Sequence, residues 1–297
     1  MALTSRTVPV HHRSRFHLVA LVRRIRLVAS SAFELALRQA YGQHTLGANG
    51  GLCGEVSPQV RYHRGIMDDA TETGDVGGGP ERAVGEMLRS ALATPLEGWR
   101  EVYESFSPVD LETGERRGRV PPPGTDSRRA AVLVPVLLEH QGPRLVYTVR
   151  RDDLQDHAGQ ISFPGGSMDP ADASLMETAL REAEEEIDLG RDLVEIVGEL
   201  EEMYIPPSNF WVSPFVGLLR PEAEMVLAPD EVEEIFTVSV EELLAPKTFR
   251  KVLWRRDGRD YEVPVFAVEG SRREIWGATA AITAALLARL GWDGYHA

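Results

Sequence analysis

The chain has 297 residues, of which 43% are hydrophobic, so it can form one or two domains with a buried core. Its formal net charge of −14 at pH 7 argues against a protein that binds nucleic acid or an anionic membrane by general electrostatic attraction. The single cysteine, Cys53, excludes a disulfide framework and a cysteine-rich zinc site. We therefore expect a cytoplasmic protein with neither nucleic acid nor membrane among its partners.

The first 82 residues differ in charge from the rest of the chain. Residues 1–50 contain seven arginines and one acid, Glu34, which gives a local charge of +6. Residues 66–82 combine acids with three consecutive glycines, which is typical of a linker. We predict that residues 1–82 form a basic, disordered leader and linker. The alternative is an organellar transit peptide, which has a similar arginine- and serine-containing, acid-poor composition.

Residues 83–129 are predicted to form a helix and a proline-rich connection, because PPPG and the charges around it disfavour regular structure. Ordered structure then begins with apolar, β-branched segments. Strands are expected at 130–139, 144–151, 160–163, 193–205 and 211–219, a strand turning into a short helix at 236–244, a hairpin around Asp257-Gly258, and a last helix ending at Gly291. Strands before and after helices, without regular alternation, indicate a mixed-sheet α+β or α/β/α layered domain over 130–297.

A helix predicted for residues 171–187 contains the unusual segment REAEEE. Its start is expected to be capped by Asp169 or Asp172, with Pro170 in the first turn. Steps of three and four residues predict a buried stripe made of Met176, Ala179, Leu180, Ala183 and Ile187.

On another face of this helix, Glu182, Glu185 and Glu186 stand at positions i, i+3 and i+4, so their carboxylates are neighbours. Arg181 is the nearby cation, and there is no lysine between residues 144 and 246. Magnesium prefers oxygen ligands of this kind. The alternative is an acidic, solvated face. The two glycines of the upstream FPGG segment favour the metal site, because backbone there can approach a ligand or expose a carbonyl.

These residues carry a resemblance to a known family. Gly166, five residues, Asp172, eight residues and then REAEEE from Arg181 resemble the Nudix box. The family pattern has Glu in place of Asp172, a spacer shorter by one residue, and Gly in place of Asp188. Asp172 and the longer spacer are similar to the coenzyme A pyrophosphatase branch of the family, as is the segment HAGQISFPGG at residues 157–166.

The resemblance implies a Nudix-type α/β/α sandwich and an enzyme, a pyrophosphohydrolase that uses Mg²⁺ or Mn²⁺. It implies metal ligation by Glu182, Glu185, Glu186 and the carbonyl of Gly166. Glu182 and Glu185 would be catalytic, with Glu182 also a candidate base. Arg181 would orient the site by pairing with Asp172 or Glu185.

Further candidates lie outside the box. Glu231 and Glu234 are alternatives for an acid from a later loop, or ordinary surface acids. Arg150 and Arg151 could bind a substrate phosphate or merely end a strand, although Arg151 and Gln155 depart from the upstream motif of the coenzyme A branch. The remaining candidates each have a structural alternative: His157 as base or turn residue, and Tyr204, Phe210 and Trp211 as adenine-stacking or core residues.

The expected substrate is a small nucleotide derivative, coenzyme A or its thioesters, hydrolysed to 3′,5′-ADP and 4′-phosphopantetheine. ADP-ribose, NADH and nucleoside triphosphates are the alternative substrates. A Nudix-fold binding or regulatory module without hydrolysis is the alternative from another class, and the complete set of glutamates argues against it. A homodimer is compatible with the sequence.

Overall fold

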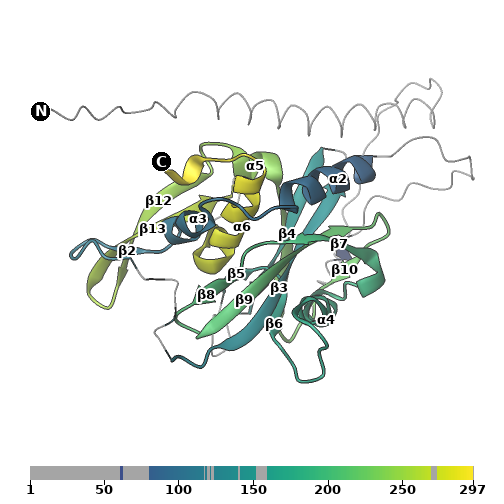
Figure 1. The fold of residues 1–297 in the computed structure, drawn as a ribbon, viewed down its shortest axis with the longest axis horizontal. Coiled ribbons are helices and arrows are strands. Elements are labelled where there is room, and N and C mark those ends of the chain that lie inside the picture. The colour runs from purple at the N-terminus through teal and green to yellow at the C-terminus, as the bar shows by residue number, and fades with distance from the viewer. Residues whose placement is uncertain are drawn as a thin grey trace, which may run out of the picture.

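The computed structural model describes residues 61–62, 80–116, 118, 121, 124–139, 141–151, 159–268 and 273–296 (Figure 1). Most of the predicted leader therefore lies outside the described residues, as do Cys53, Gln155 and His157. Two leader residues form strand β1 (Arg61–Tyr62), which pairs with β10 (Met225–Val226). No described helix has the length and apolar character needed to cross a lipid bilayer.

The described residues contain a mixed eight-stranded sheet, whose central path has the order β11-β4-β3-β9-β7. Strands β3 and β9 run parallel over nine paired residues from Arg128 to Val136, and the other pairs on this path are antiparallel. The strands are β3 (Arg128–Glu139), β4 (Gly142–Arg150), β5 (Ile161–Ser162), β6 (Gly165–Ser167), β7 (Val194–Glu199), β8 (Met203–Ile205), β9 (Phe210–Leu219) and β11 (Val232–Ser239). The strands predicted from the apolar segments are confirmed, with 193–205 divided into β7 and β8.

Helices cover both faces of this sheet, and alternating side chains of β4 show why. Val146 belongs to the apolar cluster under α4 (Leu175–Ile187). Tyr147, the next residue, points to the opposite face, where its hydroxyl lies 3.0 Å from that of Thr283 on α6 (Gly277–Arg289). Each face of the sheet is apolar because each is buried under a helix. The predicted α/β/α sandwich is confirmed.

A second, smaller sheet lies beside the first (Figure 1). It consists of β12 (Phe249–Arg256), β13 (Arg259–Ala267) and β14 (Glu274–Trp276), with β2 (Val109–Asp110) paired to β13. The predicted hairpin at Asp257-Gly258 is confirmed, since both residues have positive φ, 52° and 79°. The shorter elements are η1 (Arg191–Leu193), α5 (Val240–Leu244) and η2 (Gly294–His296).

The segment before the first long strand packs into the same core. It forms α2 (Pro80–Leu92) and α3 (Trp99–Ser105) rather than one helix, because the left-handed Gly98 precedes α3. Tyr103 and Phe106 are almost completely buried. The Tyr103 hydroxyl donates to the carbonyl of Glu201 at 2.6 Å. The predicted domain boundary at residue 130 stays a prediction. The packing joins residues 80–110 to the core of the domain predicted for residues 130–297.

Candidate active site

The helix that carries the glutamates, α4, begins later than the sequence predicts. Its N-cap is Ser174, whose hydroxyl accepts a hydrogen bond from the backbone N–H of Glu177 at 3.2 Å. The Glu177 carboxylate accepts in return from the N–H of the residue before the cap, at 2.8 Å. These reciprocal bonds satisfy N–H groups at the helix start. The prediction that Asp169 or Asp172 is the cap is wrong, because both lie in the preceding turn, where Asp172 N–H donates to the Asp169 carbonyl.

The buried face of α4 also differs from the predicted stripe. Met176 is 40% exposed, whereas the side chain of Glu186 is only 3% exposed. The buried residues are Thr178, Ala179, Ala183, Glu186 and Ile187. A carboxylate therefore enters the face that packs on the sheet, and this requires partners for its charge.

The end of α4 is fixed by Asp188 in the left-handed conformation, with φ 52°. The N–H of Asp188 donates to the Glu184 carbonyl at 3.0 Å, and the N–H of Leu189 donates to the Ala183 carbonyl at 3.3 Å. The bond from the left-handed Asp188 to the carbonyl four residues earlier is the αL C-capping motif, in which glycine is the usual left-handed residue. Gly190, the nearest glycine, does not end the helix, because it precedes η1 with φ −56°.

Two glycines bring the β5–β6 region close to α4. A Cβ atom on Gly165 would lie 2.4 Å from the carbonyl oxygen of Ala131, so a side chain has no room there. The backbone N–H of Gly165 donates to Glu186 Oε2 at 3.2 Å. A Cβ atom on Gly166 would lie 2.6 Å from the carboxylate of Glu182. The backbone of both glycines therefore lies directly against the predicted metal-binding carboxylates.

Arg181 connects the acids of the Nudix-like segment. Its Nε and Nη2 atoms donate to the two oxygens of Asp172, each at 3.0 Å. Its Nη1 atom donates to Glu182 Oε1 and to Glu185 Oε2, each at 2.9 Å. The sequence offered Asp172 or Glu185 as its partner, and the structure shows both. This guanidinium lowers the pKa of Asp172, and that carboxylate raises the pKa of Arg181.

The carboxylates lie near enough to affect one another. Burial raises the pKa of Glu186 to about 8, although Arg150 and the Gly165 N–H counteract it. Burial also raises the pKa of Glu182. The charges of Glu231 and of the neighbouring glutamates add to both increases. The site is therefore a partly buried cluster of carboxyl groups whose ionisation is disfavoured.

The two candidate acids of the later loop occupy different places. Glu231 is exposed and acts electrostatically on Glu182 and Glu186, so the fold brings it to the carboxylates. Glu234 instead forms an ion pair with Arg273. The loop docks on the end of α4, since the N–H of Ala228 donates to the Glu186 carbonyl at 2.9 Å.

The two candidate phosphate-binding arginines both contact the protein itself. Arg150 Nη1 lies 3.4 Å from Glu186 Oε1. Arg151 Nη1 donates to the carbonyl of Pro229 at 2.5 Å. Arg150 is therefore beside the carboxylates, and Arg151 lies against the loop that carries Glu231.

The donors in this region suit a hard divalent cation. They are carboxylate oxygens and the backbone at Gly166, the ligand types that magnesium prefers. Among the described residues, no three His, Cys, Asp or Glu side chains are already arranged around one ion position. Arg181 instead pairs with Glu182 and Glu185, and Arg150 pairs with Glu186. The chemistry of the residues fits the metal, and these arginines balance the negative charge of the cluster.

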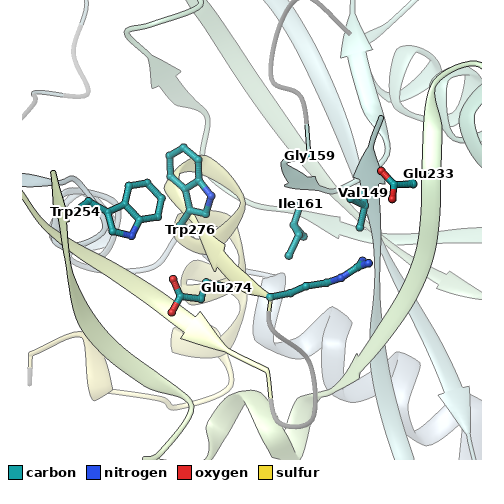
Figure 2. Close-up of a pocket in the computed structure, with 8 residues that line it drawn as sticks. Val149, Gly159, Ile161, Glu233, Trp254, Glu274 and Trp276 are labelled. Carbon is teal, nitrogen blue, oxygen red and sulfur yellow. The ribbon is translucent and has the colours of Figure 1, made fainter. Parts of the chain in front are cut away.

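A pocket of about 370 Å³ lies near the same end of the main sheet (Figure 2). It is lined by Val149, Gly159, Ile161, Glu233, Trp254, Arg273, Glu274 and Trp276. The two indoles meet edge to face, with centroids 4.7 Å apart and planes at 72°. The aromatic candidates Tyr204, Phe210 and Trp211 are not part of this lining. The sequence analysis did not select Trp254 or Trp276, and no local spacing relates them.

Comparisons with known proteins identify the family. Residues 127–256 match the family model described as NUDIX domain. The uncharacterized Nudix hydrolase NudL of Photorhabdus laumondii is 37% identical over 168 residues, which cover 55% of this chain and 88% of that protein. The protein of the same description from Yersinia pestis strain Pestoides F is 38% identical over 156 residues, covering 52% and 76%.

Among solved structures, a Caenorhabditis elegans Ap4A hydrolase binary complex gives a TM-score of 0.33 at 18% identity, covering 39% of this chain and 82% of that one. That likeness is too low to add to the assignment. The sandwich, the glutamate helix and its glycine turn define a Nudix hydrolase. The chain belongs to the Nudix family, as the NudL proteins of Photorhabdus laumondii and Yersinia pestis show.

Proposed function

We propose that the protein hydrolyses the diphosphate bond of coenzyme A or its thioesters and releases 3′,5′-ADP and 4′-phosphopantetheine. The observation that supports the hydrolytic part is the contact of Glu182 and Glu186 with the glycine turn, Glu182 at Gly166 and Glu186 at Gly165, with Glu185 tied to Glu182 through Arg181. Magnesium or manganese held by these residues would supply charge screening and activation of water.

The chain's own residues have separate tasks in this proposal. Arg181 is a positioning residue, because its fork fixes Glu182 and Glu185 relative to Asp172. Glu186 is held by the N–H of Gly165 in a nearly buried position. These contacts set the carboxylates in place before substrate arrives, which favours catalysis.

Proton transfer is assigned to Glu182. As water attacks phosphorus, a P–O bond forms, the P–O bond to the leaving phosphate breaks, and the water proton passes to a base. Glu182 is a suitable acceptor, because burial raises its pKa above the ordinary value of a glutamate. Glu231, at the edge of the cluster, is the candidate acid from the later loop.

The preference for coenzyme A rests on the sequence resemblance: Asp172, the longer spacer and the HAGQISFPGG segment. Recognition of its 3′-phosphate needs a cation, and Arg150 and Arg151 remain the candidates. Each contacts the protein itself, so binding a phosphate would require it to share or change that contact. ADP-ribose, NADH and nucleoside triphosphates are the alternative substrates within the same reaction.

The test is a product assay of the full chain with coenzyme A, dephospho-coenzyme A, ADP-ribose and NADH in magnesium or manganese. We expect kcat/KM for coenzyme A to exceed that for dephospho-coenzyme A by about tenfold, the scale of one charge-assisted contact. Replacing the responsible arginine by Ala should remove this difference. Equal rates on both compounds, with faster turnover of ADP-ribose, would contradict the coenzyme A assignment.

A matched pair of variants tests the carboxylate assignment. Glu186→Gln removes a buried carboxylate, and Glu184→Gln removes an exposed one on the same helix that pairs with Arg191. Loss of groups that only support a metal ligand typically costs 10–100-fold, so losing a ligand should cost at least about 100-fold in kcat. We expect that loss for Glu186→Gln and near-normal activity for Glu184→Gln. Full turnover of Glu186→Gln at saturating magnesium would remove Glu186 from the ligand set.

A further inference from the structure

We propose that the pocket between the two sheets binds the purine base of the nucleotide, by stacking on Trp254 and Trp276. The proposal rests on the proposed function in one respect, that the substrate is an adenine nucleotide. It adds a binding site and specificity residues that the Nudix-like segment does not contain.

The pocket has two walls that come from different parts of the fold (Figure 2). Val149, Ile161 and Glu233 belong to the main sheet or border it. Trp254 belongs to β12 and Trp276 to β14, so both come from the smaller sheet. Figure 2 shows the indoles on one side of the pocket and Val149 with Glu233 on the other. The smaller sheet thus supplies the aromatic wall.

The pocket lies close to the carboxylates, on the other face of the main sheet. Val149 lines the pocket, while Arg150, the next residue of β4, reaches Glu186 at 3.4 Å. Glu233 also lines the pocket, and Glu231, just before β11, acts electrostatically on Glu186. Successive strand side chains point to opposite faces. A nucleotide that passes the end of the sheet can therefore place its phosphates near the carboxylates and its base in the pocket.

The lining favours an uncharged aromatic ring over an anionic group. Two indoles and the aliphatic side chains of Val149 and Ile161 provide apolar surface, and the edge-to-face indole pair leaves ring faces that do not stack on each other. Aromatic side chains of this kind stack favourably on any nucleobase, because every base has a π-face.

The charged groups of the lining also favour an uncharged base over an anionic group. Arg273 is engaged by Glu234 and lies over the ring of Phe236, with its guanidinium carbon 5.5 Å from the centroid. Glu274 is paired with Arg250 at 2.9 Å, and Glu233 is a further carboxylate. Carboxylates accept hydrogen bonds and repel phosphate, so they suit the exocyclic amino group of adenine. A phosphate or carboxylate of the substrate is disfavoured here.

The test measures binding of AMP to the full chain by isothermal titration calorimetry, in magnesium chloride and without turnover. We expect Trp276→Ala and Trp254→Ala each to weaken AMP binding about tenfold or more, as for the loss of one base–aromatic stack. Trp276→Phe should restore most of the affinity, because a phenyl ring still stacks. Leu253→Ala is the matched control: Leu253 is the neighbour of Trp254 on β12 and is 68% exposed, so AMP binding should not change.

Further ligands separate the possible occupants. Ribose 5-phosphate lacks the base, so its binding should be the same in wild type and in the tryptophan variants. IMP lacks the exocyclic amino group and should bind more weakly than AMP. The inference is overturned if the folded tryptophan variants bind AMP normally. It is also overturned if they lose binding of 4′-phosphopantetheine and keep binding of AMP. Because hydrolysis is not measured, a failed coenzyme A assay and a failed base pocket give different results.

Discussion

The acidic site on α4 and the aromatic pocket beside it are built in opposite ways. The carboxylates of Glu182, Glu185 and Glu186 come from one helical turn, and two glycines just upstream complete their surroundings. The pocket combines main-sheet residues with Trp254 and Trp276, which come from separate strands of another sheet. The spacing of the glutamates in the sequence predicts the acidic site, whereas the aromatic pocket forms only where the two sheets pack together.

This difference has a consequence for stability. The acidic site depends on α4, its caps and the glycine turn, all within residues 165–189. The pocket depends on how the smaller sheet is held against the rest of the molecule. Phe106 contributes to that contact: its ring stacks on Phe266 of β13 at 5.4 Å and lies 5.5 Å from Phe249 of β12. Changes far from either site can therefore affect the two regions unequally.

The largest effect is expected from Phe106→Ala. Phe106 has no exposed surface. Truncating a buried phenylalanine typically costs about 3–5 kcal/mol, from lost burial and from the cavity left behind. We expect the free energy of unfolding in urea to fall by that amount, and AMP affinity to fall more than magnesium affinity. Leu111→Ala is the control, because Leu111 is 52% exposed and should change stability by less than about 0.5 kcal/mol. Unchanged stability of Phe106→Ala would show that residues 80–110 do not belong to the core.

Arg181→Lys should affect the acidic site alone. A lysine cannot reproduce the planar fork that contacts Asp172, Glu182 and Glu185 together. We expect kcat to fall about 10–100-fold, as for other groups that orient metal ligands, while AMP affinity is kept. Arg191→Lys is the matched control, since Arg191 makes one exposed ion pair with Glu184. If Arg181→Lys kept full activity with unchanged magnesium dependence, the positioning role would be refuted.

The buried carboxylate of Glu186 predicts a pH-dependent stability when divalent cations are removed with EDTA. Its pKa is raised from 4.5 to about 8 by burial. Between pH 4.5 and about 8, the Glu186 carboxyl group is protonated in the folded protein and ionised in the unfolded chain. Its stabilising contribution is therefore present at low pH and is lost as the pH rises towards 8. We expect wild type to lose about 2 kcal/mol relative to Glu186→Gln between pH 6 and 8. Parallel stability curves for the two proteins would contradict this account.

The sequence predicted the sandwich, most strands, the Asp257-Gly258 hairpin and the helix with its glutamates. It failed where a tertiary contact outweighs local pattern. Met176 fits the apolar spacing, yet Glu186 is the buried residue, and Gly165 and Arg150 supply polar partners for its carboxyl group. The roles of the glutamates and arginines stay predictions. Trp276 could have been noticed as an aromatic residue just before a helix, but its relation to Trp254 arises only from strand pairing.

The smallest effect concerns two aspartates with the same backbone strain, one in each region. Asp188 ends the acidic helix and Asp257 turns the β12–β13 hairpin, and each has φ 52°. Left-handed conformations cost roughly 1–2 kcal/mol for ordinary residues and less for aspartate, so Gly should relieve part of that cost. We expect Asp188→Gly to raise the free energy of unfolding by about 0.5–1 kcal/mol without changing activity, because its N–H bond to the Glu184 carbonyl is kept. Asp257→Gly should gain less, since Asp-Gly is already a favoured pair for this turn. Asp188→Ala, which keeps the Cβ atom and loses the polar group, is the control and should be less stable than wild type. A loss of stability in Asp188→Gly would mean that the Asp188 side chain, rather than its backbone, ends the helix.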